Sequence, residues 1–116
     1  MQSTDLPFDR PVVLDNLGGD TELLAQIAGL FIDDWPRNRA CLKDALAAAD
    51  AETLRNAAHA IKGAVANFCA EHAMQTAREL EMTSRAGNLA QAPAQVDATI
   101  AAVEELVIAL RAELGS

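Results

Sequence analysis

Residues 53–68 read TLRNAAHAIKGAVANF, and this stretch decides the fold predicted for the whole chain. Its apolar residues recur every three or four positions, as they do along one buried face of an α-helix: Leu54, Ala58, Ile61, Val65 and Phe68. At about 100° per residue, His59 points roughly 140° away from the centre of that face. We therefore expect His59 on the exposed side of the helix, with Arg55 and Lys62 one turn before and one turn after it.

Gly63 is an unusual residue for the interior of this helix. Glycine costs about 1 kcal/mol there relative to alanine, which would suit an exposed helical position. One interpretation is that the surface beside His59 must carry no side chain at this position, so that another molecule can approach. The alternative is a tolerated glycine next to a solvated histidine, and the spacing alone leaves both open.

The composition favours one soluble helical domain spanning residues 1–116. This length can bury a hydrophobic core without disulfides or a metal ion. Hydrophobic residues make up 51% of the chain but aromatic residues only 3%, and the abundance of alanine favours helix over sheet. The chain has no apolar run of about 18 residues and no signal peptide, so we expect it to be cytoplasmic and not bound to a membrane.

Charge and cysteine content exclude several classes of partner and site. The 17 acidic and 9 basic residues give a net charge of −8, which argues against nucleic acid or an anionic membrane as the main partner. Cys41 and Cys69 lie far apart in the sequence and are expected to be reduced. Together with His59 and His72 they show no metal-ligand spacing, so no metal site is predicted.

The hydrophobic periodicity predicts an all-α fold, an antiparallel four-helix bundle with a short extra helix at the N-terminus. Residues 1–10 are expected to be loose, and a short helical turn is expected over residues 11–17. The first long helix is predicted over about 21–49, with a kink or a restart near Pro36. Its inward residues are expected to include Leu23, Leu24, Ile27, Leu30 and Phe31.

Three more boundaries follow from capping and turn residues. The central helix is expected to begin after Asp50, its N-cap, and to end near Phe68. The next helix is predicted over residues 71–85, ending before Gly87. The last helix is expected to follow a polar link and to present apolar residues from Val96 onward.

A short turn at Cys69 and Ala70 folds the central helix and the next one back on each other. Residues equally far from the turn then face each other, so paired residue numbers sum to about 140, and His59 is expected opposite Glu81. The same rule pairs Lys62 with Arg78, Arg55 with Arg85, and Ala66 with Met74. Four basic residues around His59 would suit a transient anion such as a phosphoryl group. An ordinary set of helix-surface charges is the alternative.

The sequence HAIKG at residues 59–63, followed by Leu80-Glu81 on the next helix, resembles the histidine-containing phosphotransfer (HPt) domain. The resemblance covers nearly the whole chain. It includes Leu17-Gly18-Gly19-Asp20 before the first long helix, Phe31 within it, and Ala49-Asp50 before the central helix. Members of that family usually have glycine ten residues after the histidine, where this chain has Cys69. A left-handed turn is harder for cysteine, so the turn is expected to be of another type or mildly strained.

The resemblance implies a phosphorelay carrier. His59 would accept a phosphoryl group from the aspartyl phosphate of a receiver domain and pass it to the aspartate of another receiver. Glu81 would orient the imidazole, and Lys62 would stabilise the phosphoryl charge, supported by Arg78 or Arg55. The residues expected to meet the docked partner are Arg55, Gly63, Ala66 and Arg78.

The implied partners are response-regulator receiver domains and a hybrid histidine kinase. The receiver brings the Mg²⁺ ion, so no cofactor is expected on this chain, which is expected to be a monomer. It lacks a Gly-rich nucleotide-binding motif and is expected to be a phosphotransfer intermediate rather than an ATP-dependent kinase. Two alternatives are a non-phosphorylating helical adaptor that docks a receiver domain or histidine kinase, and a self-associating helical bundle.

Overall fold

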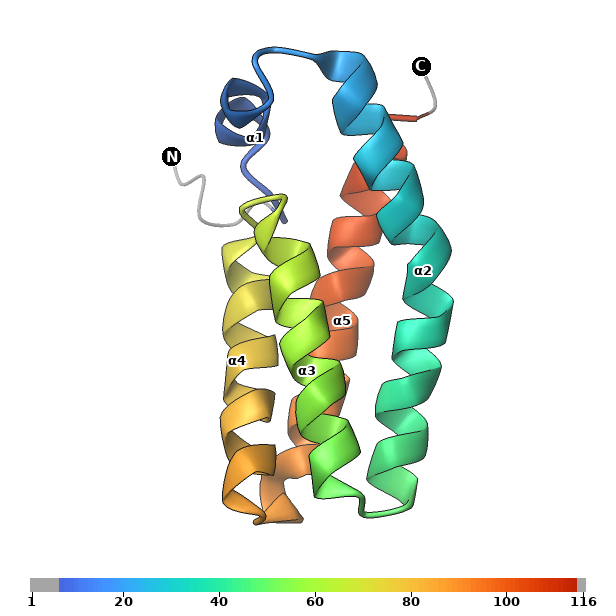
Figure 1. The fold of residues 1–116 in the computed structure, drawn as a ribbon, viewed down its shortest axis with the longest axis vertical. Coiled ribbons are helices and arrows are strands. Elements are labelled where there is room, and N and C mark those ends of the chain that lie inside the picture. Colours follow the sequence, from blue (N-terminus) through green and yellow to red (C-terminus); the bar gives the residue numbers. More distant parts are fainter. Residues whose placement is uncertain (1–6, 115–116) are drawn as a thin grey trace.

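The computed structural model describes residues 7–114, which form five α-helices and one short 3-10 segment (Figure 1). The α-helices are α1 (Arg10–Asn16), α2 (Thr21–Ala47), α3 (Ala51–Ala66), α4 (Glu71–Ala86) and α5 (Ala92–Arg111), and the 3-10 segment Leu89–Gln91 precedes α5. Residues 7–114 contain no β-strand, which confirms the all-helical prediction.

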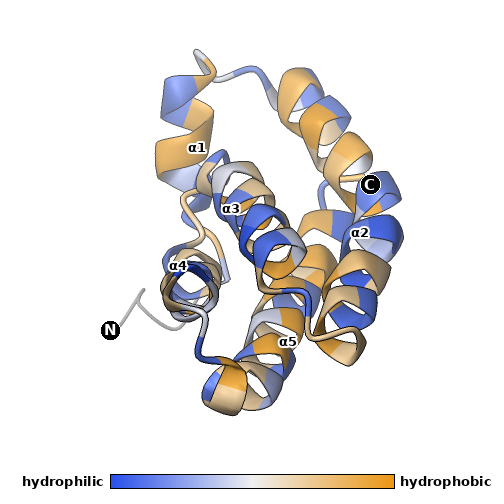
Figure 2. Cartoon of the chain, turned by 60° about the horizontal axis from the view of Figure 1, so that its bottom comes forward, coloured by the Kyte–Doolittle hydropathy of each residue, from blue (hydrophilic) through white to orange (hydrophobic). Residues whose placement is uncertain are grey.

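The four long helices lie side by side, and α1 sits near the turn that joins α3 to α4 (Figure 1). Helix α3 packs against α4 and α2, and α5 packs against α4 and α2. Figure 2 shows that each long helix carries hydrophobic residues along one side and hydrophilic residues along another. This pattern buries the apolar sides between helices and leaves the polar sides to water.

Aliphatic side chains from all four long helices make up most of the core, which also includes the rings of Phe31, Trp35 and Phe68. Burying one such side chain fully stabilises the fold by about 1.5–3 kcal/mol. The largest aliphatic side chains with almost no exposed surface include Leu24, Leu42, Leu54, Ile61, Leu80, Leu106 and Leu110. Because α3 contributes Leu54 and Ile61 to this core, its opposite side, which carries His59, faces outward.

The helix ends follow the sequence signals closely. The side chains of Asp20 and Asp50 accept hydrogen bonds from the first turns of α2 and α3, as N-cap residues do. Gly87 adopts a φ of 80° directly after α4, which confirms the predicted stop. Cys69 has a φ of 51°, so the turn between α3 and α4 has the left-handed conformation that is strained for cysteine.

The described part of the segment expected to be loose, residues 7–10, contacts the bundle. Residues 1–6 lie outside the described residues. Phe8 is buried, and its ring lies edge-to-face against Phe68 with 6.4 Å between the centroids. Arg10 begins α1 and forms an ion pair with Glu113, with 2.9 Å between Nε and Oε2. The aromatic contact thus orders the chain immediately before α1.

Two prolines lie within the long helices. Helix α2 continues through Pro36, so of the predicted kink or restart the restart is wrong. An interior proline costs about 3 kcal/mol, and the burial of Phe31, Trp35 and Leu42 on the same helix offsets this cost. Helix α5 begins at Ala92 and has Pro93 in its first turn, where proline is well tolerated.

Candidate functional site

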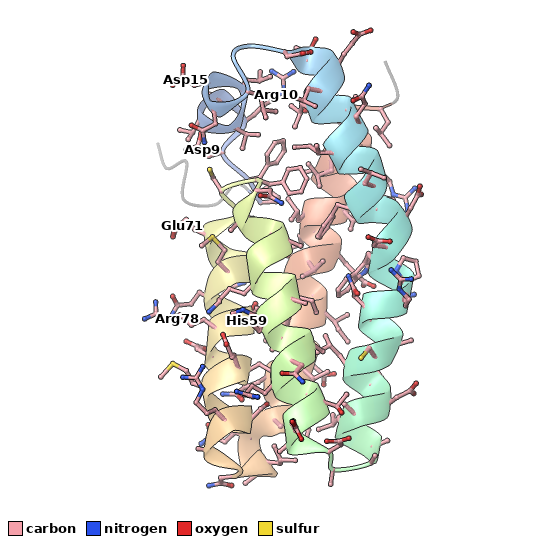
Figure 3. The ribbon with its side chains drawn as sticks, in the orientation of Figure 1. Asp9, Arg10, Asp15, His59, Glu71 and Arg78 are labelled. Atoms are coloured by element: carbon pink, nitrogen blue, oxygen red, sulfur yellow. The ribbon has the colours of Figure 1, made fainter. Side chains whose placement is uncertain are left out.

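His59 lies on the exposed side of α3, where the periodicity placed it. Its side chain is 68% exposed, whereas Ala58 and Ile61 beside it are buried. In Figure 3 the imidazole lies on the side of α3 that faces α4. The core therefore fixes the backbone of this residue while the ring itself remains accessible to another molecule.

Glu81 anchors the imidazole from α4. Its Oε2 atom lies 2.8 Å from Nδ1 of His59, and its side chain is only 6% exposed. The predicted pairing of these two residues is confirmed. When Glu81 is ionised it can only accept a hydrogen bond, so Nδ1 carries the proton and donates it. The other ring nitrogen, Nε2, then has a free lone pair.

Two cations share the Glu81 carboxylate with His59. Nζ of Lys62 lies 2.7 Å from Oε1, and an Nη atom of Arg85 lies 3.4 Å from Oε2. The hydrogen bond from Lys62 is the main reason why the pKa of Glu81 lies below its ordinary value. Burial acts in the opposite direction, and the hydrogen bond to His59 lowers the pKa further. Glu81 is therefore a stably ionised group at the base of the exposed imidazole.

The pairing of Lys62 with Arg78 stays a prediction about helix register. The ammonium of Lys62 contacts Glu81, one helical turn further along α4, because the buried carboxylate attracts it and Arg78 would repel it. Figure 3 shows Arg78 extending from α4 away from the bundle. Among residues 7–114, neither Arg55 nor Arg78 forms an ion pair with a carboxylate. The basic residues thus divide into two that hold Glu81 and two that remain unpaired.

Gly63 and Ala66 are exposed on α3, one and two helical turns after His59. A Cβ atom added at Gly63 would meet no heavy atom within 4 Å, so packing within the described part of the chain does not require glycine here. Both interpretations of Gly63 remain open on this observation. The pairing of Ala66 with Met74 stays a prediction.

A shallow groove between α2 and the end of α3 was missed by the sequence analysis. It has a volume of about 240 Å³ and is lined by Ile27, Leu30, Phe31, Asp34, Asn38, Ala64, Asn67 and Phe68. Leu30 was expected to point inward, but it is 67% exposed. Phe31 and Ala28 take the inward positions, and Leu30 is rotated about 100° from Phe31 around the helix axis.

Between residues 7 and 114, no three side chains of His, Cys, Asp or Glu are grouped so as to hold a metal ion. In the same part of the chain, no helix combines the length and the apolar character needed to cross a membrane. Cys41 and Cys69 are both free thiols.

Comparison with known proteins agrees with this arrangement. The family model of the Hpt domain matches residues 26–113, well over half of the chain. A similar solved structure is histidine-containing phosphotransfer protein B (HptB) from Pseudomonas aeruginosa PAO1, with 27% sequence identity and a TM-score of 0.85. That match covers 93% of this chain and 94% of HptB. No curated protein matched the chain. The chain belongs to the Hpt domain family.

Proposed function

We propose that this chain is a phosphorelay carrier. His59 accepts a phosphoryl group from the aspartyl phosphate of one receiver domain and passes it to the aspartate of another. The observation that carries the proposal is an exposed imidazole whose Nδ1 is anchored to the buried carboxylate of Glu81 at 2.8 Å. Membership of the Hpt family and the likeness to HptB support it.

The hydrogen bond to Glu81 suits Nε2 of His59 to act as the nucleophile. The Nε2 lone pair attacks phosphorus, the bond between phosphorus and the aspartate oxygen breaks, and the aspartate leaves as a carboxylate. The proton stays on Nδ1, so the ring becomes cationic, and the ionised Glu81 stabilises this positive charge. The reverse sequence of bond changes delivers the phosphoryl group to the second receiver.

Positive side chains around His59 supply the charge that a phosphoryl group requires. Its transition state is loose, so alignment and charge neutralisation contribute most of the rate. Lys62 lies one helical turn from His59 and carries three N–H donors, only one of which is needed by Glu81. Arg55 and Arg78 add positive charge near the phosphoryl group, and neither has to break an ion pair with a described carboxylate first. The Mg²⁺ ion belongs to the receiver, and the chain uses no cofactor of its own.

The scaffold for this site is an antiparallel four-helix bundle of α2–α5, with α1 as the extra helix. The partner docks over the outer face of α3, where Gly63 gives clearance and Ala66 is a small contact residue. The groove beside Leu30 adjoins this face through Ala64 and Asn67 and extends the docking surface with apolar area. The chain acts as a monomer in the cytoplasm, with a hybrid histidine kinase and response-regulator receivers as partners and without ATP-dependent kinase activity.

Phosphotransfer from a panel of phosphorylated receiver domains tests the proposal. At least one receiver is expected to label the chain, and adding an unphosphorylated receiver is expected to remove the label again. A chain that binds receivers but never becomes labelled would contradict the carrier function and indicate a helical adaptor instead. Gel filtration on the same samples measures whether the chain is a monomer.

A further inference from the structure

The carboxylate of Glu81 has two cationic partners, Lys62 and Arg85, and they contact it at different distances. Lys62 contacts Oε1 at 2.7 Å, and His59 contacts Oε2 at 2.8 Å. Arg85 contacts Oε2 at 3.4 Å, which is long for a charge-assisted hydrogen bond. Its side chain remains 65% exposed, whereas that of Lys62 is 31% exposed. Arg85 is therefore a peripheral partner of Glu81 in this state.

Phosphorylation of His59 changes the demand for positive charge at this place. A phosphoryl group brings a charge of about −1.5 to −2 and three strong acceptor oxygens. Lys62 is the nearest candidate, because it follows His59 by three residues on the same helix face and has a long flexible side chain. If Lys62 turns to the phosphoryl group, the buried Glu81 loses its closest counterion. The cationic ring then stays beside Oε2, but Oε1 is left without a positive partner, and incomplete pairing of a buried carboxylate is unfavourable.

We infer that Arg85 is a positioning residue that replaces Lys62 as the counterion of Glu81 when His59 carries a phosphoryl group. The inference rests on the proposed function and adds a role for a residue outside the motif around His59. Arg85 follows Glu81 by four residues on α4, so its guanidinium can close the remaining gap by side-chain rotation alone. Only ion pairs change in this exchange, and no covalent bond forms or breaks.

The exchange keeps His59 aligned in both states. With Arg85 in place, Glu81 stays ionised and continues to accept the hydrogen bond from Nδ1 while Lys62 neutralises the phosphoryl oxygens. Without Arg85, Lys62 has to serve two anions, and the phosphoryl group receives less positive charge. A nearby cation favours the more ionised form of a phosphate. The pKa of the phosphoryl group is therefore lower when Lys62 contacts it and higher when Lys62 stays on Glu81.

The test labels the full chain chemically, so that it does not depend on finding the right receiver. Phosphoramidate phosphorylates histidine directly: its P–N bond breaks, a bond forms between phosphorus and Nε2, and ammonia leaves. Every sample carries His72→Gln, because phosphoramidate would also label that exposed histidine. The resonance of phosphorylated His59 is then followed by ³¹P NMR from neutral to mildly acidic pH, since the second pKa of a phosphoryl group is ordinarily about 6. The variants are Arg85→Gln, Arg85→Lys, Glu81→Gln, Glu81→Gln with Arg85→Gln, and Lys43→Gln. Arg55 and Arg78, two further charged residues on these helices, stay unchanged throughout.

Arg85→Gln is expected to raise the pKa of the phosphoryl group by at least about half a unit. Arg85→Lys is expected to restore most of the wild-type value. In the Glu81→Gln background the carboxylate charge is gone and Lys62 needs no replacement, so adding Arg85→Gln is expected to cause no further rise. Lys43 is exposed on α2 and matches the charge change, and its substitution is expected to shift the pKa by less than about 0.2 units.

Three results would overturn the inference. One is an unchanged pKa in Arg85→Gln, and another is an equal rise in Lys43→Gln, which would indicate an effect of overall charge. The third is a rise that persists in the Glu81→Gln background, which would mean that Arg85 contacts the phosphoryl group itself. Failure of phosphoramidate to label His59 would contradict the proposed function and this inference together.

Discussion

The Oε2 atom of Glu81 lies 2.8 Å from Nδ1 of His59, across 22 residues of sequence and from a different helix. One partner is nearly buried and the other is mostly exposed. The packing of α3 against α4 therefore sets the orientation of a ring that a second protein can reach. Pre-alignment of this kind removes part of the entropic cost of a transfer reaction.

Replacing Glu81 tests whether this hydrogen bond orients the nucleophile. Glu81→Ala is expected to slow phosphotransfer by up to about 100-fold, because the ring loses its acceptor and can rotate. Glu81→Gln keeps a carbonyl acceptor and is expected to retain most of the rate. Single-turnover transfer measures both, with circular dichroism as a check on the fold. Glu79→Ala, on the exposed side of α4, is the matched control. An unchanged rate in folded Glu81→Ala would show that the contact does not orient His59.

The pH dependence of stability tests the charge state of Glu81. Its pKa in the folded protein lies below the ordinary value of 4.5, chiefly because of the hydrogen bond from Lys62. The ionised carboxylate therefore stabilises the fold at pH values above about 4.5, and this contribution disappears as the pH falls through the folded-state pKa. In urea unfolding, the stability advantage of the wild type over Glu81→Gln is expected to shrink as the solution becomes acidic. A difference that stays constant with pH would contradict this account.

The contact between His59 and Glu81 could be predicted because a short turn fixes the register of two helices. The same register could not predict the contact of Lys62, because it places backbone positions and not the ends of long side chains. The ammonium of Lys62 lies 2.7 Å from the carboxylate of Glu81. The burial of Glu81 was not predicted either, although it continues a line of buried residues after Ala73 and Ala77 at four-residue spacing.

The continuity of α2 could not be predicted from local signals. Pro36 removes one backbone hydrogen bond, and a local rule therefore favours a break. The outcome depends on how much apolar surface the rest of the helix buries, which only the packing against α3 and α5 determines. The exposure of Leu30 could not be predicted either. Leu30 and Phe31 are adjacent and point in different directions from the helix, and only the packing determines that Phe31 is the buried one.

Substitutions at Gly63 are expected to affect the stability of the fold and the docking of the partner differently. Gly63→Ala is expected to raise the free energy of unfolding by about 0.5–1 kcal/mol, since a Cβ there meets nothing within 4 Å. Gly63→Gln is expected to raise KM for a phosphorylated receiver with little change in maximal rate. Gly29→Ala, also within a helix, is the control and is expected to stabilise the fold without changing KM. An unchanged KM in Gly63→Gln would favour the tolerated-glycine interpretation.

The turn at Cys69 carries strain that glycine would relieve. Cys69→Gly is expected to raise the free energy of unfolding by up to about 1 kcal/mol, because the φ of 51° is unfavourable for any residue with a Cβ atom. The same substitution at Cys41, inside α2, is expected to lower it by about 1 kcal/mol. Urea unfolding of both variants measures the difference. A loss of stability of similar size at both positions would contradict the assignment of strain to the turn.

The most direct test of the carrier function is to locate the phosphoryl group after transfer from a phosphorylated receiver. The chain has two histidines, and His72 lies exposed at the start of α4, so His72→Gln is a matched control for His59→Gln. We expect an acid-labile, base-stable label on the wild type and on His72→Gln, and none on His59→Gln. A label that persists in folded His59→Gln, or that disappears in His72→Gln, would contradict the account.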